Sequence, residues 1–527
     1  MSTQNEKYIL AIDVATTGPK SALVSTYGEV VDLEFEEIRL LLPPNGGAEQ
    51  NPDEWWEAIK KTSKRLLSKR LVPIDDIVAV SCTGQWSGTV AVDKNGNHLM
   101  NAIIWMDSRG SPYVKDITGG WIKIRGYGVI KLLRWLRLTG GIPTHSGKDS
   151  IAHILYIKNK FPGIYKKTHK FLEPKDYINL RFTGKFAASF DSIALHWLTD
   201  NRDLSSVVYD RRLVKMSTLN QDKLPELKRA IDILGPIKKE IAQEFGLNEN
   251  VQVVMGTPDV QSTAIGSGAV RDFEPHLYIG TSSWLTCHVP FKKTDIYHNI
   301  ATLPSAIPER YIVANEQETA GACLTFLRDN ILCHKDELLT ETQQSDVLGI
   351  FNKIAENVPA GSNKVIFTPW LYGERTPIDN HSVRACFFNQ SLQTTREDLI
   401  RAVFEGVAYN SRWLLGYVER FVKRRLDYIN IVGGGANSNI WCQIYADVLD
   451  RTIRQVKDPI QASLRGAAFL ASVALGYLSF SDIPENIKIA ATFKPSSENR
   501  KIYDELFKIF KNIYNSNKSI YARLNRV

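Results

Sequence analysis

Short apolar runs alternate with polar turns over the first part of the chain. Residues 8–13 form an apolar run, and residues 20–25 form a second one beyond the turn TTGP. Residues 30–35 give a third run after the turn YGE. Apolar runs of this length, bounded by turn residues, are typical of β-strands. The pattern predicts three antiparallel strands with polar side chains held in the first turn.

A helix and another strand follow. Over residues 53–67 the apolar positions Trp56, Ile59 and Leu66 recur at helical spacing among charges, and NPD at the start supplies helix-capping chemistry. Residues 77–83 form a buried strand that ends at a Gly-Gln pair. Strands that alternate with helices predict an α/β fold.

The same order of elements returns in the second half. The pattern predicts strands at 276–279, 284–289, 428–432 and 452–456, and helices at 439–449 and 462–478. The repeat lies in element order and not in residue identity, so it indicates two domains of similar architecture, 1–270 and 271–527. Residues 110–250 are interpreted as an insertion that shapes the substrate side of the first domain. The pattern over residues 499–527 predicts a basic amphipathic helix that packs on the protein by one face and exposes the other face to solvent.

Length and composition narrow the class of protein. The 527 residues suit two to four domains, and 43% hydrophobic with 23% charged residues is normal for a globular chain. The net charge of +8 is spread along the chain without a nucleic-acid motif, so no nucleic-acid partner is expected. No signal peptide or membrane span is expected, and six scattered cysteines indicate reduced thiols. We expect a cytoplasmic protein with no membrane partner, and a homodimer stays open.

The first turn carries residues that suit a nucleotide phosphate and its metal. Asp13 ends a strand, Thr16 and Thr17 follow in the turn, and Lys20 comes next. A carboxylate can hold Mg²⁺ through water, and hydroxyl and turn N–H groups can donate to phosphate oxygens. Lys20 could neutralise phosphate charge. An ordinary hairpin turn is an equally good interpretation of this motif alone.

Two other turns resemble the first in chemistry. Gly280, Thr281 and Ser282 join two apolar strands, which suggests a second clamp on the same polyphosphate. The glycines Gly433–Gly435 follow a strand and precede a helix, where a flat ring or a phosphate can approach the backbone. A plain strand-to-helix turn is the alternative for the glycines. The string is not GxGxxG, so it does not predict a dinucleotide site.

An acidic residue begins a helix of small residues near the middle of the chain. Asp259 stands in the string GTPDVQSTAIGSG. In phosphoryl transfer a carboxylate commonly accepts the proton of the attacking hydroxyl. The alternative is that Asp259 serves only as the cap of its helix.

Two polar strings beside tryptophans suit a polyhydroxylated ligand. Gln85 and Trp86 follow one strand, and Asp107 and Arg109 follow another. Carboxylate and amide groups bind sugar hydroxyls, while aromatic rings cover the C–H face. The alternative is a structural ion pair between Asp107 and Arg109.

Taken in order, these motifs are similar to those of the FGGY carbohydrate kinases, most closely the xylulokinase-like branch. The resemblance runs from Tyr8 to about Leu478. The matching strings are DxxTTxxK, GQxxG, WxDxR, the Asp259 string, GTS, PWLYGERTP, EGVA, GGGANS and ADVL. Each string is short, but together and in this order they are highly specific.

The resemblance implies two ribonuclease-H-like domains of the actin, Hsp70 and sugar kinase type that flank a catalytic cleft. It implies ATP and Mg²⁺ as cofactors, a small sugar or polyol as substrate, and Asp259 as general base and substrate contact. It implies Asp13 beside Mg²⁺, and Gln85, Trp86, Asp107 and Arg109 on the sugar side. The ATP-binding residues implied are Thr16, Thr17, Lys20, Gly280, Thr281, Ser282, Gly321, Gly433, Gly434, Gly435 and Asn437.

Three positions depart from the family pattern. Ala15 replaces the usual glycine of the first turn, and Ser87 and Val260 replace polar sugar contacts of xylulokinases. We expect a ketose such as xylulose, a related ketose or a polyol as the acceptor. The departures keep one alternative open, a catalytically weakened kinase-fold protein that senses sugar or nucleotide. A chaperone-type or cytoskeletal ATPase on the same scaffold is disfavoured by the sugar-side strings.

Overall fold

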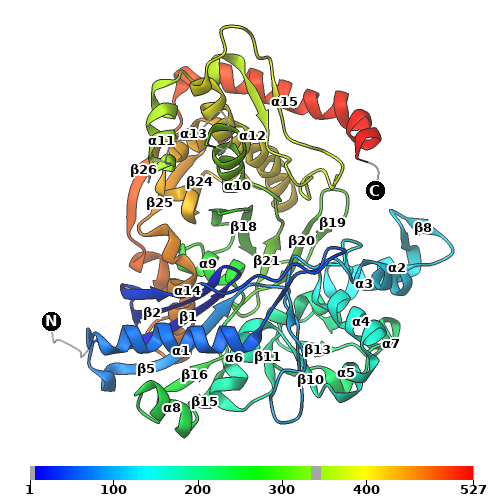
Figure 1. The fold of residues 1–527 in the computed structure, drawn as a ribbon, viewed down its shortest axis with the longest axis vertical. Coiled ribbons are helices and arrows are strands. Elements are labelled where there is room, and N and C mark those ends of the chain that lie inside the picture. Colours follow the sequence, from blue (N-terminus) through cyan, green and yellow to red (C-terminus); the bar gives the residue numbers. More distant parts are fainter. Residues whose placement is uncertain (1–5, 334–345, 526–527) are drawn as a thin grey trace.

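The computed structural model describes residues 6–333 and 346–525. Two lobes, each built on a mixed β-sheet with helices against it, lie one above the other in Figure 1. The lower lobe holds the blue N-terminal strands and the upper lobe holds most of the yellow and orange elements. This arrangement confirms the predicted α/β class.

The sheet of the lower lobe has six strands in the order β15-β16-β5-β1-β2-β3. β1, β2 and β3 pair antiparallel, as predicted, and β5 pairs parallel with β1. Helix α1 (Pro52–Ser68) begins where the Asn51 side chain accepts the Asp53 N–H at 2.9 Å. The strands are β1 (Tyr8–Ala15), β2 (Gly18–Ser25), β3 (Val30–Phe35), β5 (Ile77–Gly84), β15 (Ile233–Pro236) and β16 (Gln252–Val254).

The sheet of the upper lobe has eight strands in the order β19-β20-β21-β18-β17-β24-β25-β26. It repeats the lower sheet in part: β17 and β18 form an antiparallel hairpin, and β24 pairs parallel with β17. The strands are β17 (Pro275–Ile279), β18 (Ser283–Val289), β19 (Thr294–Asp295), β20 (Ile300–Pro304), β21 (Tyr311–Ala314), β24 (Tyr428–Val432), β25 (Thr452–Val456) and β26 (Ile489–Phe493). The predicted repeat of element order is therefore present.

The main core of the upper lobe surrounds one long helix, α12, which packs with α13 and α15. Helix α15 buries Tyr503, Leu506 and Phe510 and exposes its opposite face, which agrees with the predicted solvated helix. The helices are α10 (Gly321–Phe326), α11 (Val347–Asn357), α12 (Arg396–Val422), α13 (Asn439–Leu449) and α15 (Ser497–Leu524). None of the helices in the described ranges is long and apolar enough to cross a membrane.

Helix α14 (Ala462–Ala474) comes late in the sequence but packs on the lower sheet, where Leu464 and Ala467 meet Ile9 and Ala11. The prediction extended this helix to 478, which is wrong, because the chain turns away after Ala474. The division of the chain near residue 270 stays a prediction.

The segment from the end of β5 to the end of α9, which also supplies β15 and β16 to the lower sheet, contains more helix than strand and forms the cyan and green side of the lower lobe (Figure 1). Its own apolar cluster includes Trp135, Ile151 and Leu213. Its helices are α2 (Ser111–Thr118), α3 (Val129–Thr139), α4 (Ser150–Lys160), α5 (Pro162–Lys167), α6 (Pro174–Thr183), α7 (Arg211–Ser217), α8 (Lys239–Phe245) and α9 (Asp259–Gly266). Short strands also pair in this lobe: β4 (Glu49–Gln50) with β7 (Ala102–Ile103), β6 (Val90–Val92) with β10 (Lys170–Leu172), β8 (Lys123–Ile124) with β9 (Tyr127–Gly128), β11 (Ala187–Ser189) with β14 (Glu226–Lys228), and β12 (Thr199–Asp200) with β13 (Val208–Tyr209).

Candidate active site

Asp13 lies near the end of β1 and is buried. Its Oδ2 accepts a hydrogen bond from Ser463 Oγ at 2.7 Å, and Ser463 belongs to α14. Lys20 stands opposite Asp13 in the β1–β2 register, so both side chains lie on one face of the sheet. Residues far apart in the sequence thus fix the carboxylate and place a cation beside it.

Asp259 is half-buried at the first position of α9. Burial, together with the neighbouring charge of Asp13, raises the pKa of Asp259 to about 8. The Asp259 Oδ1 accepts the N–H of Val260 at 2.8 Å. A capping side chain would instead accept the second or third N–H of the helix from the position before it, which Pro258 occupies. Asp259 is therefore not the cap of its helix, and it forms a carboxylate pair with Asp13.

A buried polar network holds the loop that presents Asp259. Thr257 Oγ1 donates to Asp191 Oδ2, and both residues are buried. Asn179 of α6 donates its Nδ2 to the Met255 carbonyl at 2.7 Å. Because buried polar groups are costly to leave unpaired, these bonds fix the path of the chain into α9.

The hydroxyl of Thr16 is already engaged. Thr16 Oγ1 donates to Gln85 Oε1 at 3.3 Å and accepts the Trp105 Nε1–H at 3.0 Å. Gln85 also donates its Nε2 to Gln50 Oε1 at 2.8 Å. Thr17 is exposed at the tip of the same turn. The structure therefore leaves Thr17 as the freer hydroxyl and ties Gln85 into the frame of the turn.

The sugar-side string after β5 forms a tight turn. Trp86 is half-buried and donates its Nε1–H to the Ser192 carbonyl at 2.6 Å. Its main-chain N–H lies beside Asp259 and favours the charged carboxylate. Ser87 adopts a φ of 63° and donates its hydroxyl to the Lys148 carbonyl at 2.7 Å. Trp86 thus lies beside the candidate base, while the Ser87 hydroxyl is occupied.

Asp107 and Arg109 form the ion pair that the sequence left as an alternative. Arg109 donates its Nε to Asp107 Oδ2 at 2.9 Å, and its Nη2 lies 2.6 Å from Glu49 Oε1. Asp107 is buried and also accepts the main-chain N–H of Ala48 at 2.9 Å. The guanidinium lies 4.6 Å from the Tyr156 ring centroid. A contact of either residue with sugar stays a prediction.

The second turn joins β17 to β18, and α10 begins against it. The Gly321 N–H donates to the Gly280 carbonyl at 2.8 Å, so these two predicted residues meet. A Cβ on Gly321 would lie 2.6 Å from that carbonyl oxygen, which explains the glycine. Thr281 is exposed, and Ser282 is half-buried beside it. The turn therefore offers hydroxyl groups at the surface of the upper lobe.

The three glycines after β24 differ in their roles. Gly433 has a φ of 91°, and a Cβ there would lie 2.5 Å from the Ile279 carbonyl oxygen. A Cβ on Gly435 would lie 2.4 Å from the Ile279 side chain, whereas one on Gly434 would meet nothing within 4 Å. Gly434 and Asn437 are exposed. Gly433 and Gly435 thus allow close packing against Ile279, whereas a side chain at Gly434 would point into open space.

Sequence reasoning missed three residues beside the carboxylate pair. Tyr278 has a raised pKa because of burial and the charges of Asp259 and Asp13. Glu316 adds its charge to those that raise the pKa of Asp259. Ser463 has no sequence signal at all, since only the packing of α14 brings it to Asp13. For Glu316 a signal existed, the acidic string NEQE after an apolar strand.

The carboxylate pair suits a cation whose remaining ligands come from a second molecule or from water. Asp13 Oδ1 is buried and has no hydrogen-bond partner. Among residues 6–333 and 346–525, no group of three or more His, Cys, Asp or Glu could hold a metal ion. Mg²⁺ commonly takes one or two carboxylates together with phosphate oxygens and water. The orphaned oxygen of Asp13 is compatible with that kind of site.

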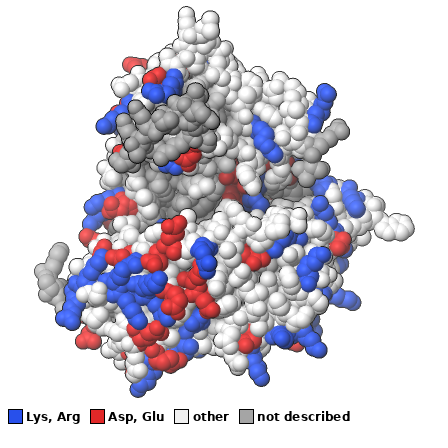
Figure 2. Space-filling model, viewed as in Figure 1, with Lys and Arg blue, Asp and Glu red and all other residues white. Residues whose placement is uncertain are grey.

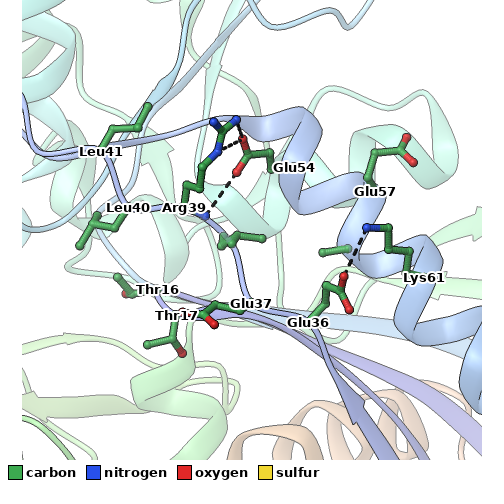
Figure 3. Close-up of a pocket in the computed structure, with 12 residues that line it drawn as sticks. Thr16, Thr17, Glu36, Glu37, Arg39, Leu40, Leu41, Glu54, Glu57 and Lys61 are labelled. Carbon is green, nitrogen blue, oxygen red and sulfur yellow. Dashed lines mark hydrogen bonds and ion pairs between the residues drawn. The ribbon is translucent and has the colours of Figure 1, made fainter.

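A separate cavity of about 770 Å³ lies beside the first turn (Figure 3). Thr16 and Thr17 line it together with residues 36–41 and side chains of α1. Arg39 pairs with Glu54 across one end of it. Neither carboxylate of the pair lines this cavity, which shares only the turn at Thr16 and Thr17 with the candidate active site.

The sequence is similar to known proteins over nearly its whole length. The model of the FGGY family of carbohydrate kinases matches with its N-terminal domain at residues 8–266 and its C-terminal domain at 277–475. The xylulose kinase of Staphylococcus epidermidis is 29% identical over 525 residues, covering 98% of this chain and 99% of the relative. The gluconokinase of Bacillus subtilis is 26% identical over 519 residues, covering 98% and 97%.

Solved structures share the fold. Gluconate kinase from Lactobacillus acidophilus superposes with a TM-score of 0.85 at 24% identity, covering 99% of this chain and 100% of that one. Glycerol kinase from Plasmodium falciparum, solved with ADP, gives a TM-score of 0.79 at 19% identity, covering 99% of both chains. The family models together match most of the sequence, and this chain therefore belongs to the FGGY family of carbohydrate kinases.

Proposed function

We propose that the chain transfers the γ-phosphate of ATP to a hydroxyl of a small sugar, of the ketose or polyol kind. One observation carries the proposal: a half-buried carboxylate with a pKa of about 8, Asp259, stands beside a buried one with a free oxygen, Asp13. The pair lies where the turn of β1 and β2 meets residues from the other lobe. Such a pair suits a general base next to a cation site.

In this reaction Asp259 takes the proton of the attacking hydroxyl. Its raised pKa matches a base that works near neutral pH. Asp13 would hold magnesium together with the phosphates, and the metal would supply positive charge to the transferred group. Thr17, Lys20 and the turn at Gly280 offer donors and charge for phosphate oxygens. Gly434, with open space above it, would border the adenosine.

Two kinds of acceptor are compatible with the relatives. Xylulose kinases act on a ketose and gluconokinases on a sugar acid, and both are about equally similar to this chain. The ketose or polyol is the acceptor that the sequence favours. A sugar acid is a second candidate, which is supported by the sheltered ammonium of Lys148 near the candidate base.

The test is ADP release by the purified protein with Mg-ATP and a panel of ketoses, polyols and sugar acids, with a control that lacks sugar. Turnover with one class of acceptor supports the kinase. Nucleotide binding without turnover on any acceptor would favour the sensor, in which Ala15, Ser87 and Val260 weaken the site. ATP hydrolysis that is independent of sugar would favour an ATPase.

A further inference from the structure

Charged side chains from both lobes gather beside the candidate base. Figure 2 shows acidic and basic side chains inside the hollow between the lobes. Lys148 comes from the loop before α4, while Glu316, Glu318 and Arg375 come from the upper lobe. Glu316 is close enough to Asp259 to raise the pKa of that carboxyl. The cluster therefore lies next to the place of reaction.

Within this cluster the two glutamates are already paired. The Arg375 Nε donates to Glu318 Oε1 at 3.0 Å, and its Nη1 donates to Glu316 Oε2. Because a guanidinium presents its donors as a rigid fork, it holds both carboxylates in fixed positions. Arg375 and its two glutamates form a compact unit on the upper lobe.

Lys148 is the member of the cluster that lacks a close partner. Its Nζ lies 3.9 Å from Glu318 Oε2, which is an ion-pair distance but too long for a hydrogen bond. No residue in the described ranges accepts a hydrogen bond from this ammonium. Only about a fifth of the side chain is exposed. Burial lowers the pKa of Lys148, and the positive charge of Arg375 lowers it further. The negative charges of Glu318 and Glu316 offset part of this shift, but among the described residues the ammonium has no hydrogen-bond acceptor, which a carboxylate of a ligand would supply.

The backbone of Lys148 is held firmly. Ser87 donates its hydroxyl to the Lys148 carbonyl, and Trp86, one residue earlier, places its main-chain N–H beside Asp259. The next residue, Asp149, is buried and accepts the Thr144 N–H at 2.7 Å. Lys148 and Asp259 thus contact neighbouring residues of one short turn, Lys148 through its carbonyl oxygen at Ser87 and Asp259 through its carboxylate at Trp86.

We propose that Lys148 is a specificity-determining residue that binds a carboxylate at one end of the acceptor, while the hydroxyl at the other end faces Asp259. The inference rests on the proposed kinase function and, of its two candidate acceptors, favours the sugar acid over the ketose or neutral polyol. The carboxylate lies at the end that contacts Lys148, because Asp13 and Asp259 would repel it near the transferred phosphate, whereas Glu316 and Glu318 are paired with Arg375. A neutral hydroxymethyl group would offer Lys148 an oxygen but no compensating charge.

The test compares acceptors of equal length that differ only at one end: gluconate with sorbitol and fructose, and xylonate with xylitol and xylulose. The variants are Lys148→Met, which keeps the length of the side chain, and Lys160→Met, an exposed lysine at the end of α4 that loses the same charge. We expect the wild type to have a higher kcat/KM on the acids. Lys148→Met should raise KM for the acids about 30-fold or more and leave KM for ATP unchanged. Lys160→Met should behave as the wild type.

Two outcomes would overturn the inference while the kinase stands: a wild type that prefers the neutral acceptors, or an equal loss on acids and neutral acceptors in Lys148→Met. The second result would mean that Lys148 holds the lobes together through Glu318. Binding is measured separately, by thermal stabilisation with gluconate alone. Stabilisation of the wild type but not of Lys148→Met supports the carboxylate site even without turnover, in which case the proposed kinase function alone has failed. No stabilisation and no turnover with acids refutes the site.

Discussion

Replacing Asp259 by asparagine should remove turnover and stabilise the fold. The asparagine keeps the shape of the side chain and cannot accept a proton. The loss of a general base typically lowers kcat about 10²- to 10⁴-fold. Stability should change in the other direction, because the wild-type carboxyl is held in surroundings that disfavour its charge.

The magnitude follows from the pKa. The Asp259 carboxyl titrates at about 8 in the folded protein instead of its usual 3.8. The folded state therefore binds the proton more tightly than the unfolded state, and the wild type loses stability as pH rises from about 4 towards 8. Each pKa unit is worth about 1.4 kcal/mol, so full burial would cost ~4 kcal/mol at pH 7. Because Asp259 is only half-buried, water in the cleft screens the effect, and about 1–2 kcal/mol is expected.

The assay combines thermal unfolding at several pH values with ADP release. The asparagine variant should have a Tm about 1–3 °C above the wild type at pH 7, with a smaller difference near pH 5. In the wild type, kcat/KM should rise as pH approaches 8, because the base must lose its proton before it can act. A variant that is less stable than the wild type at pH 7, or that retains turnover, would refute the assignment of Asp259.

Three further variants test other parts of the site. Gly433→Ala should destabilise the protein by more than about 1 kcal/mol, because its φ is 91° and a Cβ would meet a carbonyl oxygen. Gly434→Ala should leave Tm unchanged and raise KM for ATP. Equal Tm values for the two variants would contradict the different roles of these glycines. Ser463→Ala should raise the Mg²⁺ concentration needed for half-maximal rate, since it removes the donor to Asp13; an unchanged Mg²⁺ titration would argue against the role of that carboxylate. Thr257→Val should cost about 1–3 kcal/mol in urea unfolding by removing a hydrogen-bond donor to the buried Asp191 carboxylate, and a smaller change would mean that the loop is held elsewhere.

The fold could be predicted where local pattern and tertiary role agree. The strands 428–432 and 452–456 and the helix 439–449 match the structure residue by residue, because apolar alternation and glycine turns mark their ends. The helix after residue 462 was predicted too long, since its apolar positions continue beyond Ala474 into a separate short helix at Phe480–Asn486. Packing on the other sheet decides where that helix stops, and spacing alone does not contain this information.

The candidate site could be predicted in part. Asp13 and Asp259 stand at strand and helix ends that the pattern reveals, so the sequence could single out both carboxylates, and their chemical roles stay a prediction. Thr16 and Thr17 were equivalent in the sequence, and only the hydrogen bonds to Gln85 separate them. No sequence motif singled out Lys148, because the charged residues around it, Glu316, Glu318 and Arg375, belong to the other lobe and lie far away in sequence.

One pair of helices sets the geometry of the two carboxylates. α9 begins with Asp259, and α14 carries Ser463, which holds Asp13. The two helices cross with their backbones in contact: a Cβ on Gly266 would lie 1.8 Å from the Ala462 carbonyl oxygen, and one on Gly466 would lie equally close to that of Ser262. Since α14 also packs on β1, the helix pair and the strand form one rigid unit.

The turn at Gly280, the glycines after β24 and the Glu316 cluster all belong to the upper lobe, whereas the helix pair and β1 pack together on the lower sheet. A movement of the lobes would therefore change the distance from the nucleotide and acceptor contacts to the carboxylate pair, and it would leave the pair itself intact. Asp13 offers a cation only one free oxygen, so nucleotide phosphates must complete its binding site. In the proposed reaction, Asp259 and Asp13 would thus be positioned before the substrates bind, and a closure of the lobes would have only to bring the phosphate to them.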